Sequence, residues 1–362
     1  RNEPVMLVRR GAAGPWLLVL WGGIAGGVVV DVHHGRAQLV APWPAGQESS
    51  AASLAPKDFL LGHRPGPYTV LRCQGARPLG LGFHARRLWH SGQCYAEDFD
   101  SSELAKLGEA GVARSLEAGL DLALCEARVG DTHDHLCTVL LEPPEARLRL
   151  LLSPCPPVRT PSASNAAMVQ LVAAPGARER PTAKHSSWIR VREPIEAARH
   201  PDAYEAILVD AEGDGARGPL LEGLVTNLFV LLEAGDTLVT APDSVVLPGW
   251  VRSVVLEAAE DLGFRIVYEP PQVEQQNRWT AAFLTGTGRF MTPIGTMGVA
   301  GDRDPGDATV STTRTHHQFA SILASLDPGD DRVKRLFSRA CEIAGVDFGC
   351  EIDKAAAGGI GS

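Results

Sequence analysis

An acidic residue, a strand and a helix follow one another closely in residues 220–263, and this order constrains the fold more than any other feature. Glu222 lies in the apolar setting LLEGL, just ahead of the run NLFVLL, which predicts a strand. After the LPG turn, apolar residues recur at the spacing of a one-faced helix, at Val251, Val254, Val255, Ala258 and Leu262. The N–H groups at the start of that helix suit a phosphate, and a buried Glu222 needs a cationic partner. An acid paired with an arginine beside an ordinary capped helix is the alternative interpretation.

Two further segments favour a cofactor site. Upstream, PTAKHSSWIRVRE places Lys184 between the predicted strands MVQLVAAP and EAILVD. Downstream, WTAAFLTGTGRFMTPIGTM runs a strand into the turn Thr285–Gly286–Thr287. Lysine, glutamate, LPGxxR and TGT, in this order and spacing, resemble the class IV aminotransferases, the fold-type IV group of pyridoxal-phosphate (PLP) enzymes. KHSSWIRVRE, LLEGLVTNLFV and PGPYTVLR are most similar to the plant and algal members described as D-amino-acid-aminotransferase-like.

The resemblance runs from about residue 60 to 297 and implies a two-domain fold of mixed α+β and α/β character. A small N-terminal α+β domain would occupy residues 58–153, and a larger, barrel-like PLP-binding domain residues 167–298. The segment SPCPPVRTPSASN has the composition of a linker, which we place at residues 154–166. Residues 1–57 form an uncertain leader and loop-rich segment, and residues 299–362 a C-terminal extension of unknown role.

The resemblance also assigns roles in the site. Lys184 is implied to be the catalytic residue, binding PLP covalently and then acting as general base. Glu222 is implied to pair with the pyridine nitrogen of PLP and keep it protonated. The implied phosphate ligands are Arg87 of the HARRL segment, the N–H groups of Trp250 and Val251, and Thr287. Arg252 of LPGxxR is expected to form a structural ion pair.

The substrate side of the site departs from the better-known family members. RPGPYT stands where they carry GDGxxE, and Trp188 and Ile189 stand where they carry tyrosine or arginine. No set of residues for binding the substrate carboxylate therefore transfers to this chain, and the amino donor stays open.

Three functions are compatible with these residues. The first is a class IV aminotransferase acting on an amino acid and a 2-oxo acid, the second a lyase of the aminodeoxychorismate type, which releases pyruvate. The third is a catalytically silent binding protein that keeps the fold. Retention of Lys184, Glu222, Arg87 and Thr287 together counts against the third. The family resemblance also implies a homodimer.

Composition limits the other possibilities. A chain of 362 residues is long enough for two full cores. Its net charge of −9 argues against nucleic acid or an anionic membrane as the main partner. Seven cysteines without a CxxC pair suggest neither a disulfide framework nor a zinc site, and we expect the cytosol or a plastid. The pair His133 and His135 in DTHDH is interpreted as a solvated turn rather than a metal site.

The two ends of the chain are harder to interpret. The apolar run PWLLVLWGGIAGGVVV is shorter than the ~20 residues of a membrane span. It is either a signal-peptide core or, as we prefer, a buried first strand or a leader, and GGIAGG does not fit a dinucleotide loop. Residues 31–60 are expected to form loop. Near the C-terminus, THHQFASILASL and VKRLFSRACEIAGV are each expected to form a helix.

Overall fold

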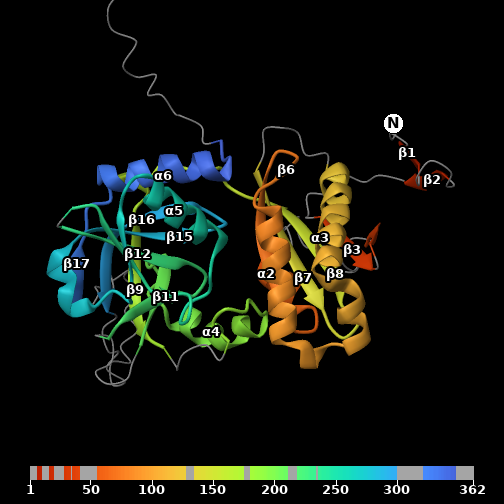
Figure 1. Cartoon of the computed structure of the whole chain (residues 1–362), viewed down its shortest axis with the longest axis horizontal. Helices are drawn as coiled ribbons and strands as arrows, with labels where there is room; N and C mark the ends of the chain where they lie inside the picture. The colour runs from red at the N-terminus through yellow and green to blue at the C-terminus, as the bar shows by residue number, and fades with distance from the viewer. Residues whose placement is uncertain are drawn as a thin grey trace, which may run out of the picture.

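The computed structural model describes residues 6–9, 16–19, 28–33, 35–40, 55–127, 134–174, 180–210, 218–233, 235–299 and 321–347. These residues form two domains, each with its own β-sheet (Figure 1). A separate antiparallel pair, β1 (Met6–Arg9) and β2 (Trp16–Val19), lies near the N-terminus. The predicted mixed α/β architecture with two domains is confirmed. Within the described ranges no helix is long and apolar enough to cross a membrane.

The small domain is a six-stranded sheet whose neighbouring strands are all antiparallel. In spatial order its strands are β4 (Arg36–Leu39), β3 (Val28–His33), β8 (Arg147–Pro154), β7 (Asp134–Glu142), β5 (Tyr68–Gln74) and β6 (Arg77–Pro78). β7 and β8 form an antiparallel hairpin, and β5 and β6 pair across the turn at Gly75. Alternating apolar residues line the covered face.

Helices cover both faces of this sheet. On one face lie α2 (Leu81–Cys94) and α3 (Ser101–Glu126), which share an apolar core with Leu71, Val139 and Leu150. The Asp100 carboxylate accepts the Ser102 N–H and so caps α3. The short helix α1 (Pro56–Leu61) packs on the other face, where Phe59 and Leu60 join a cluster with Leu140 and Leu151.

The large domain is built on a closed ring of six strands. The ring runs β11 (Leu220–Gly223), β10 (Glu205–Val209), β9 (Ala167–Ala173), β16 (Phe290–Val299), β15 (Trp279–Gly286) and β12 (Asn227–Leu232). It closes because β12 pairs back onto β11 through Glu222 and Asn227. Strands β13 (Thr237–Thr240) and β14 (Arg265–Tyr268) extend the sheet from β12, and β17 (Ser321–Ser325) pairs with β16.

Three helices complete the large domain. Helix α5 (Trp250–Asp261) buries the apolar face that the sequence predicts and packs against α6 (Asp331–Ala344). Helix α4 (Ser187–Ala198) lies at the opposite end of the barrel from α6, where the two domains meet (Figure 1). Short 3-10 turns occupy Ala96–Asp98, Ala163–Asn165 and Val273–Arg278.

Some local predictions are wrong. Residues 31–60 are not all loop. Strands β3 and β4 pair on either side of Gly35, whose φ of 73° suits glycine, β3 pairs with β8, and helix α1 begins at Pro56. Residues 321–325 form strand β17 instead of a helix, since pairing with β16 outweighs their local preference. The helix predicted in VKRLFSRACEIAGV is confirmed as α6. Most of the N-terminal apolar run, His133 and residues 300–320 lie outside the described residues.

Candidate active site

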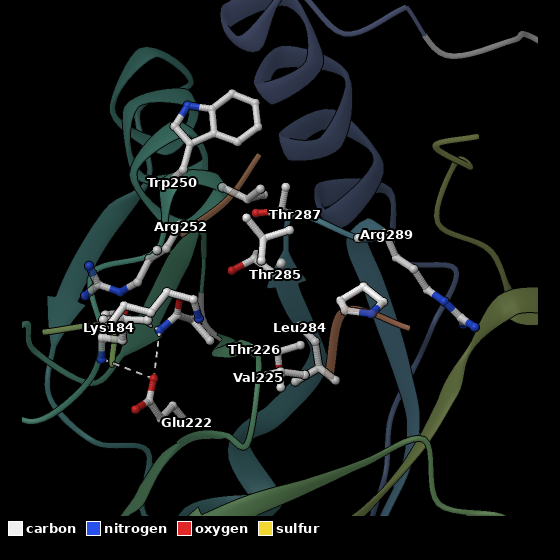
Figure 2. A pocket seen from close by; sticks show the side chains of 18 of the residues that line it. Lys184, Glu222, Val225, Thr226, Trp250, Arg252, Leu284, Thr285, Thr287 and Arg289 are labelled. Carbon is white, nitrogen blue, oxygen red and sulfur yellow. Dashed lines mark hydrogen bonds between the residues drawn. The ribbon is translucent and has the colours of Figure 1, made fainter. Parts of the chain in front are cut away.

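A cavity of about 240 Å³ opens where the two domains meet (Figure 2). Residues of α1, β5 and α2 line it from the small domain, and the large domain contributes the segments around Lys184, Glu222, the start of α5 and the end of β15. All of the site residues predicted from the sequence line this one cavity: Arg87, Lys184, Glu222, Trp250, Val251 and Thr287. Segments that are 200 residues apart in the chain thus converge on one volume.

Lys184 is held in place by its backbone. Its N–H donates to Ser91 Oγ at 3.0 Å, and its carbonyl accepts the Tyr68 N–H at 2.9 Å. A β-bridge between Pro67 and His185 continues this contact. The Lys184 Nζ atom lies 4.6 Å from the centre of the Tyr68 ring. The small domain therefore fixes the backbone from which the lysine side chain enters the cavity.

Glu222 is buried, with 3% of its surface exposed. Its Oε2 atom accepts the Leu247 N–H at 3.1 Å and an Asn227 Nδ2 hydrogen at 3.3 Å. Asn227 Nδ2 also donates to the Leu247 carbonyl at 2.8 Å, which links the strand after Glu222 to the turn before α5. A Cβ on Gly249 would meet Asn227 Oδ1 at 2.3 Å, so this linkage requires glycine in the LPG turn.

Arg87 carries a buried cation that has no carboxylate partner among the described residues. Its Nη2 atom donates to Thr69 Oγ1 at 2.5 Å and lies 3.1 Å from His84 Nδ1. Among the described residues no carboxylate lies within ion-pair distance of Arg87, and its Nε has no hydrogen-bond partner. Burial lowers the pKa of Arg87 to about 10, which still leaves it charged at neutral pH. Such a group is suited to receive an anion.

The start of α5 and the end of β15 add neutral donors beside it. Gly249 caps α5 without a side-chain hydrogen bond, so the first N–H groups of the helix face the cavity uncapped. Thr285 is buried, and its Oγ1 has no partner within the described part of the chain. Figure 2 shows Thr285 and Thr287 close together on the cavity wall. The unpartnered atoms of Arg87 and Thr285, with these N–H groups, fit a phosphate.

Thr285 was not predicted from the sequence, although a signal for it exists. Thr285 lies near the end of β15, in the same TGT motif as Thr287, so the motif itself is that signal. Arg252, in contrast, is placed as predicted. It pairs with Asp243 and donates to the Ala241 carbonyl at 2.8 Å, which makes it a structural residue.

Arg72 is a second residue that the sequence analysis missed. It is fully buried on β5 of the small domain and pairs with Asp134. Its Nε donates to the Thr287 carbonyl at 3.3 Å and its Nη2 to the Gly288 carbonyl at 2.5 Å. Arg72 thus holds the threonine turn of the large domain from the small domain. The lone arginine in the apolar strand YTVLRC was the available signal.

Comparison with known proteins agrees with this geometry. The sequence model of the amino-transferase class IV family matches residues 66–296. No curated protein matches the chain by sequence.

Several solved structures share the fold. A putative branched-chain amino acid aminotransferase from Thermotoga maritima superposes with a TM-score of 0.56 at 20% identity, covering 87% of this chain and 96% of its own. A PLP-bound hypothetical aminotransferase from Mycobacterium tuberculosis superposes with a TM-score of 0.56 at 15% identity, and the match covers 87% of this chain and 98% of that protein. The structure of the branched-chain aminotransferase of Thermoproteus uzoniensis with norvaline superposes with a TM-score of 0.54 at 18% identity, and the match covers 89% of this chain and 96% of that protein. The predicted fold-type IV architecture is therefore confirmed.

Proposed function

We propose a reaction for this chain from the premise that it belongs to the class IV aminotransferase family. It is a transferase of that class, and its cofactor is pyridoxal 5'-phosphate. The reaction that we infer moves an amino group between an α-amino acid and a 2-oxo acid. One observation carries this proposal: Lys184, the buried Glu222 and the buried Arg87, which has no carboxylate partner in the described part of the chain, line the same cavity.

Different residues of the chain would bind the phosphate, hold the ring proton and transfer the substrate proton. Arg87, Thr285, Thr287 and the N–H groups that begin α5 would hold the phosphate of PLP. Glu222, oriented by the Leu247 N–H, would hold a proton on the ring nitrogen. When bound, PLP supplies an electron sink that stabilises negative charge on the substrate Cα. Lys184 Nζ would then accept the Cα proton as general base, from a backbone fixed by the small domain.

The finer assignment rests on sequence motifs. KHSSWIRVRE and LLEGLVTNLFV support a place beside the plant and algal D-amino-acid-aminotransferase-like members. We also propose a homodimer, as the family resemblance implies. A lyase of the aminodeoxychorismate type remains the second candidate, because it requires the same lysine and glutamate.

The test is a screen for transfer of the amino group. Purified protein with PLP is incubated with L- and D-amino acids and either pyruvate or 2-oxoglutarate, and the new amino acid is measured by chromatography. We expect one donor to yield product, and Glu222→Gln to retain PLP but lose most of this activity. Pyruvate release from aminodeoxychorismate without amino transfer would identify a lyase. No turnover with any donor would contradict both reactions.

A further inference from the structure

Helix α4 brings an additional cation to the cavity. Arg192 is 8% exposed and lines the same cavity as Lys184 and Glu222. Its Nη1 donates to the Leu224 carbonyl at 3.3 Å, and its Nε lies 2.8 Å from Glu196 Oε1. Its Nη2 has no partner among the residues that the structure describes. One edge of a buried guanidinium is therefore held in place while another edge remains available to a ligand.

The other cations that line the cavity are engaged elsewhere. Arg87 contacts Thr69 and His84 and is assigned to the phosphate in the proposed function, and Arg252 pairs with Asp243. Lys57 bonds two carboxylates, Glu193 at 3.2 Å and Glu196 at 3.1 Å. Arg289 is exposed, with its guanidinium carbon 4.5 Å from the centre of the Tyr204 ring. Figure 2 shows the Arg289 side chain pointing away from Lys184 and Glu222.

The position of Arg192 on α4 aims it at the reacting end of the cavity. Helix α4 begins at Ser187, three residues after Lys184, and Arg192 lies about 7.5 Å further along the helix axis. Side chains on a helix lean toward its N-terminus, which here is the Lys184 end. The carbonyl that holds Nη1 belongs to Leu224, two residues after Glu222. The guanidinium is thus fixed next to the segment that carries Glu222.

Glu196 compensates this charge only in part. The same carboxylate contacts Lys57 through Oε2 and Arg192 through Oε1, so it serves two cations. A second anion on the open edge of Arg192 would form charge-assisted hydrogen bonds in a setting that excludes most water. Every amino acid brings such an anion, its α-carboxylate, next to the amino group that reacts.

We propose that Arg192 binds the α-carboxylate of the substrate and thereby selects α-amino acids and 2-oxo acids over amines that lack a carboxylate. This assignment rests on the proposed aminotransferase function. Glu196 is then a positioning residue, because its carboxylate lies within ion-pair distance of Nε at one side of the guanidinium.

The experiment compares Arg192→Gln with Arg190→Gln, a matched control, since Arg190 is exposed on the same helix. Each variant is assayed with the best amino acid donor and with the amine that results when hydrogen replaces its carboxylate. We expect Arg192→Gln to raise KM for the amino acid about 10- to 100-fold, as loss of a charged hydrogen bond does. Turnover of the amine should stay within about twofold of wild type, and Arg192→Lys should give an intermediate KM.

A binding measurement supplements the kinetics. Calorimetric titration with pyruvate should show weaker binding to Arg192→Gln and unchanged binding to Arg190→Gln. An equal effect on amino acid and amine, or none on either, would overturn the assignment of Arg192 while leaving the aminotransferase function intact. A wild-type enzyme that transfers no amino group would overturn both.

Discussion

At the scale of single residues, the setting of Arg87 is the hardest to explain without a bound anion. A buried cation is costly unless it is paired, yet among the described residues the hydrogen-bonding contacts of Arg87 are the uncharged Thr69 and His84. His84 is fully buried beside it. Burial, and then the charges of Arg87 and Lys184, hold the pKa of His84 well below its usual 6.5. His84 is therefore neutral and able to accept a hydrogen bond from Arg87.

This neutral histidine predicts acid sensitivity. In the unfolded chain His84 protonates near pH 6.5, whereas in the fold it resists protonation, so its contribution to stability is present above pH 6.5 and is lost as the pH falls. Between pH 7.5 and 5.5 the loss is up to about 1.4 kcal/mol. Urea unfolding at both pH values should show a smaller loss for His84→Gln than for wild type, and equal losses would contradict this account of His84.

At the scale of elements, the start of α5 is fixed from three directions. Asn227 contacts the turn before the helix, and the Trp250 ring packs against Phe290, which in turn contacts Phe337 of α6 (centroid distances of 6.2 Å each). On the third side lies Gly80, where an added Cβ would meet the Trp250 indole at 2.4 Å. The start of α5, which we propose binds the phosphate, thus depends on the small domain as well as on its own barrel.

Gly80→Ala should disturb this contact. Gly80 has a φ of 63°, and the added methyl group would overlap the indole, so we expect a loss of about 1–3 kcal/mol in unfolding free energy and weaker PLP binding. Gly82→Ala is the control, because its Cβ would meet only the end of the Arg86 side chain at 3.5 Å. Urea unfolding and fluorescence titration with PLP measure both effects. Equal unfolding free energies and PLP affinities for the two variants would contradict a role for the contact between Gly80 and the Trp250 indole.

The elements also show what the sequence can predict. β12 and α5 were predicted because their apolar periodicity reflects one buried face each. Helix α4 was missed, since Pro194 lies inside it and few of its residues are buried. Strands β3 and β17 acquire their conformation from partners far away in the chain, β8 and β16. Local patterns do not report such pairings.

In the site, too, residues in local motifs were predicted, whereas residues placed by distant contacts were not. Lys184, Glu222 and the LPG turn belong to contiguous motifs, so their chemistry could be recognised from the sequence. Arg72 and Arg192 matter because of where the fold places them. Arg72 reaches the Thr287 turn across 215 residues of chain, and Arg192 depends on a helix that the sequence did not predict.

At the scale of the whole molecule, the cavity exists only where the two domains meet. Arg72 is a main connection, since it joins Asp134 of the small domain, Pro156 of the linker and the Thr287–Gly288 turn. Three carbonyl oxygens and a carboxylate converge on this one buried guanidinium. The placement of the Thr287–Gly288 turn relative to the small domain therefore depends on Arg72.

Arg72→Gln should destabilise the contact between the two domains. Breaking a buried ion pair from one side costs about 3–5 kcal/mol, because Asp134 is left without its cation. We expect a lower melting temperature and weaker PLP binding, whereas Arg114→Gln, at an exposed position on α3, should change neither. Normal PLP affinity in a folded Arg72→Gln would contradict the role of Arg72 in holding the threonine turn.

The most direct test of the central claim is the absorbance spectrum of the purified protein with added PLP. Lys184→Ala is compared with wild type and with Lys106→Ala, whose lysine is exposed on α3. We predict a visible band from lysine-bound PLP in wild type and in Lys106→Ala, abolished by borohydride, and its absence in Lys184→Ala. A band that persists in Lys184→Ala, or no band in wild type, would contradict the assignment of this cavity as a PLP site built on Lys184.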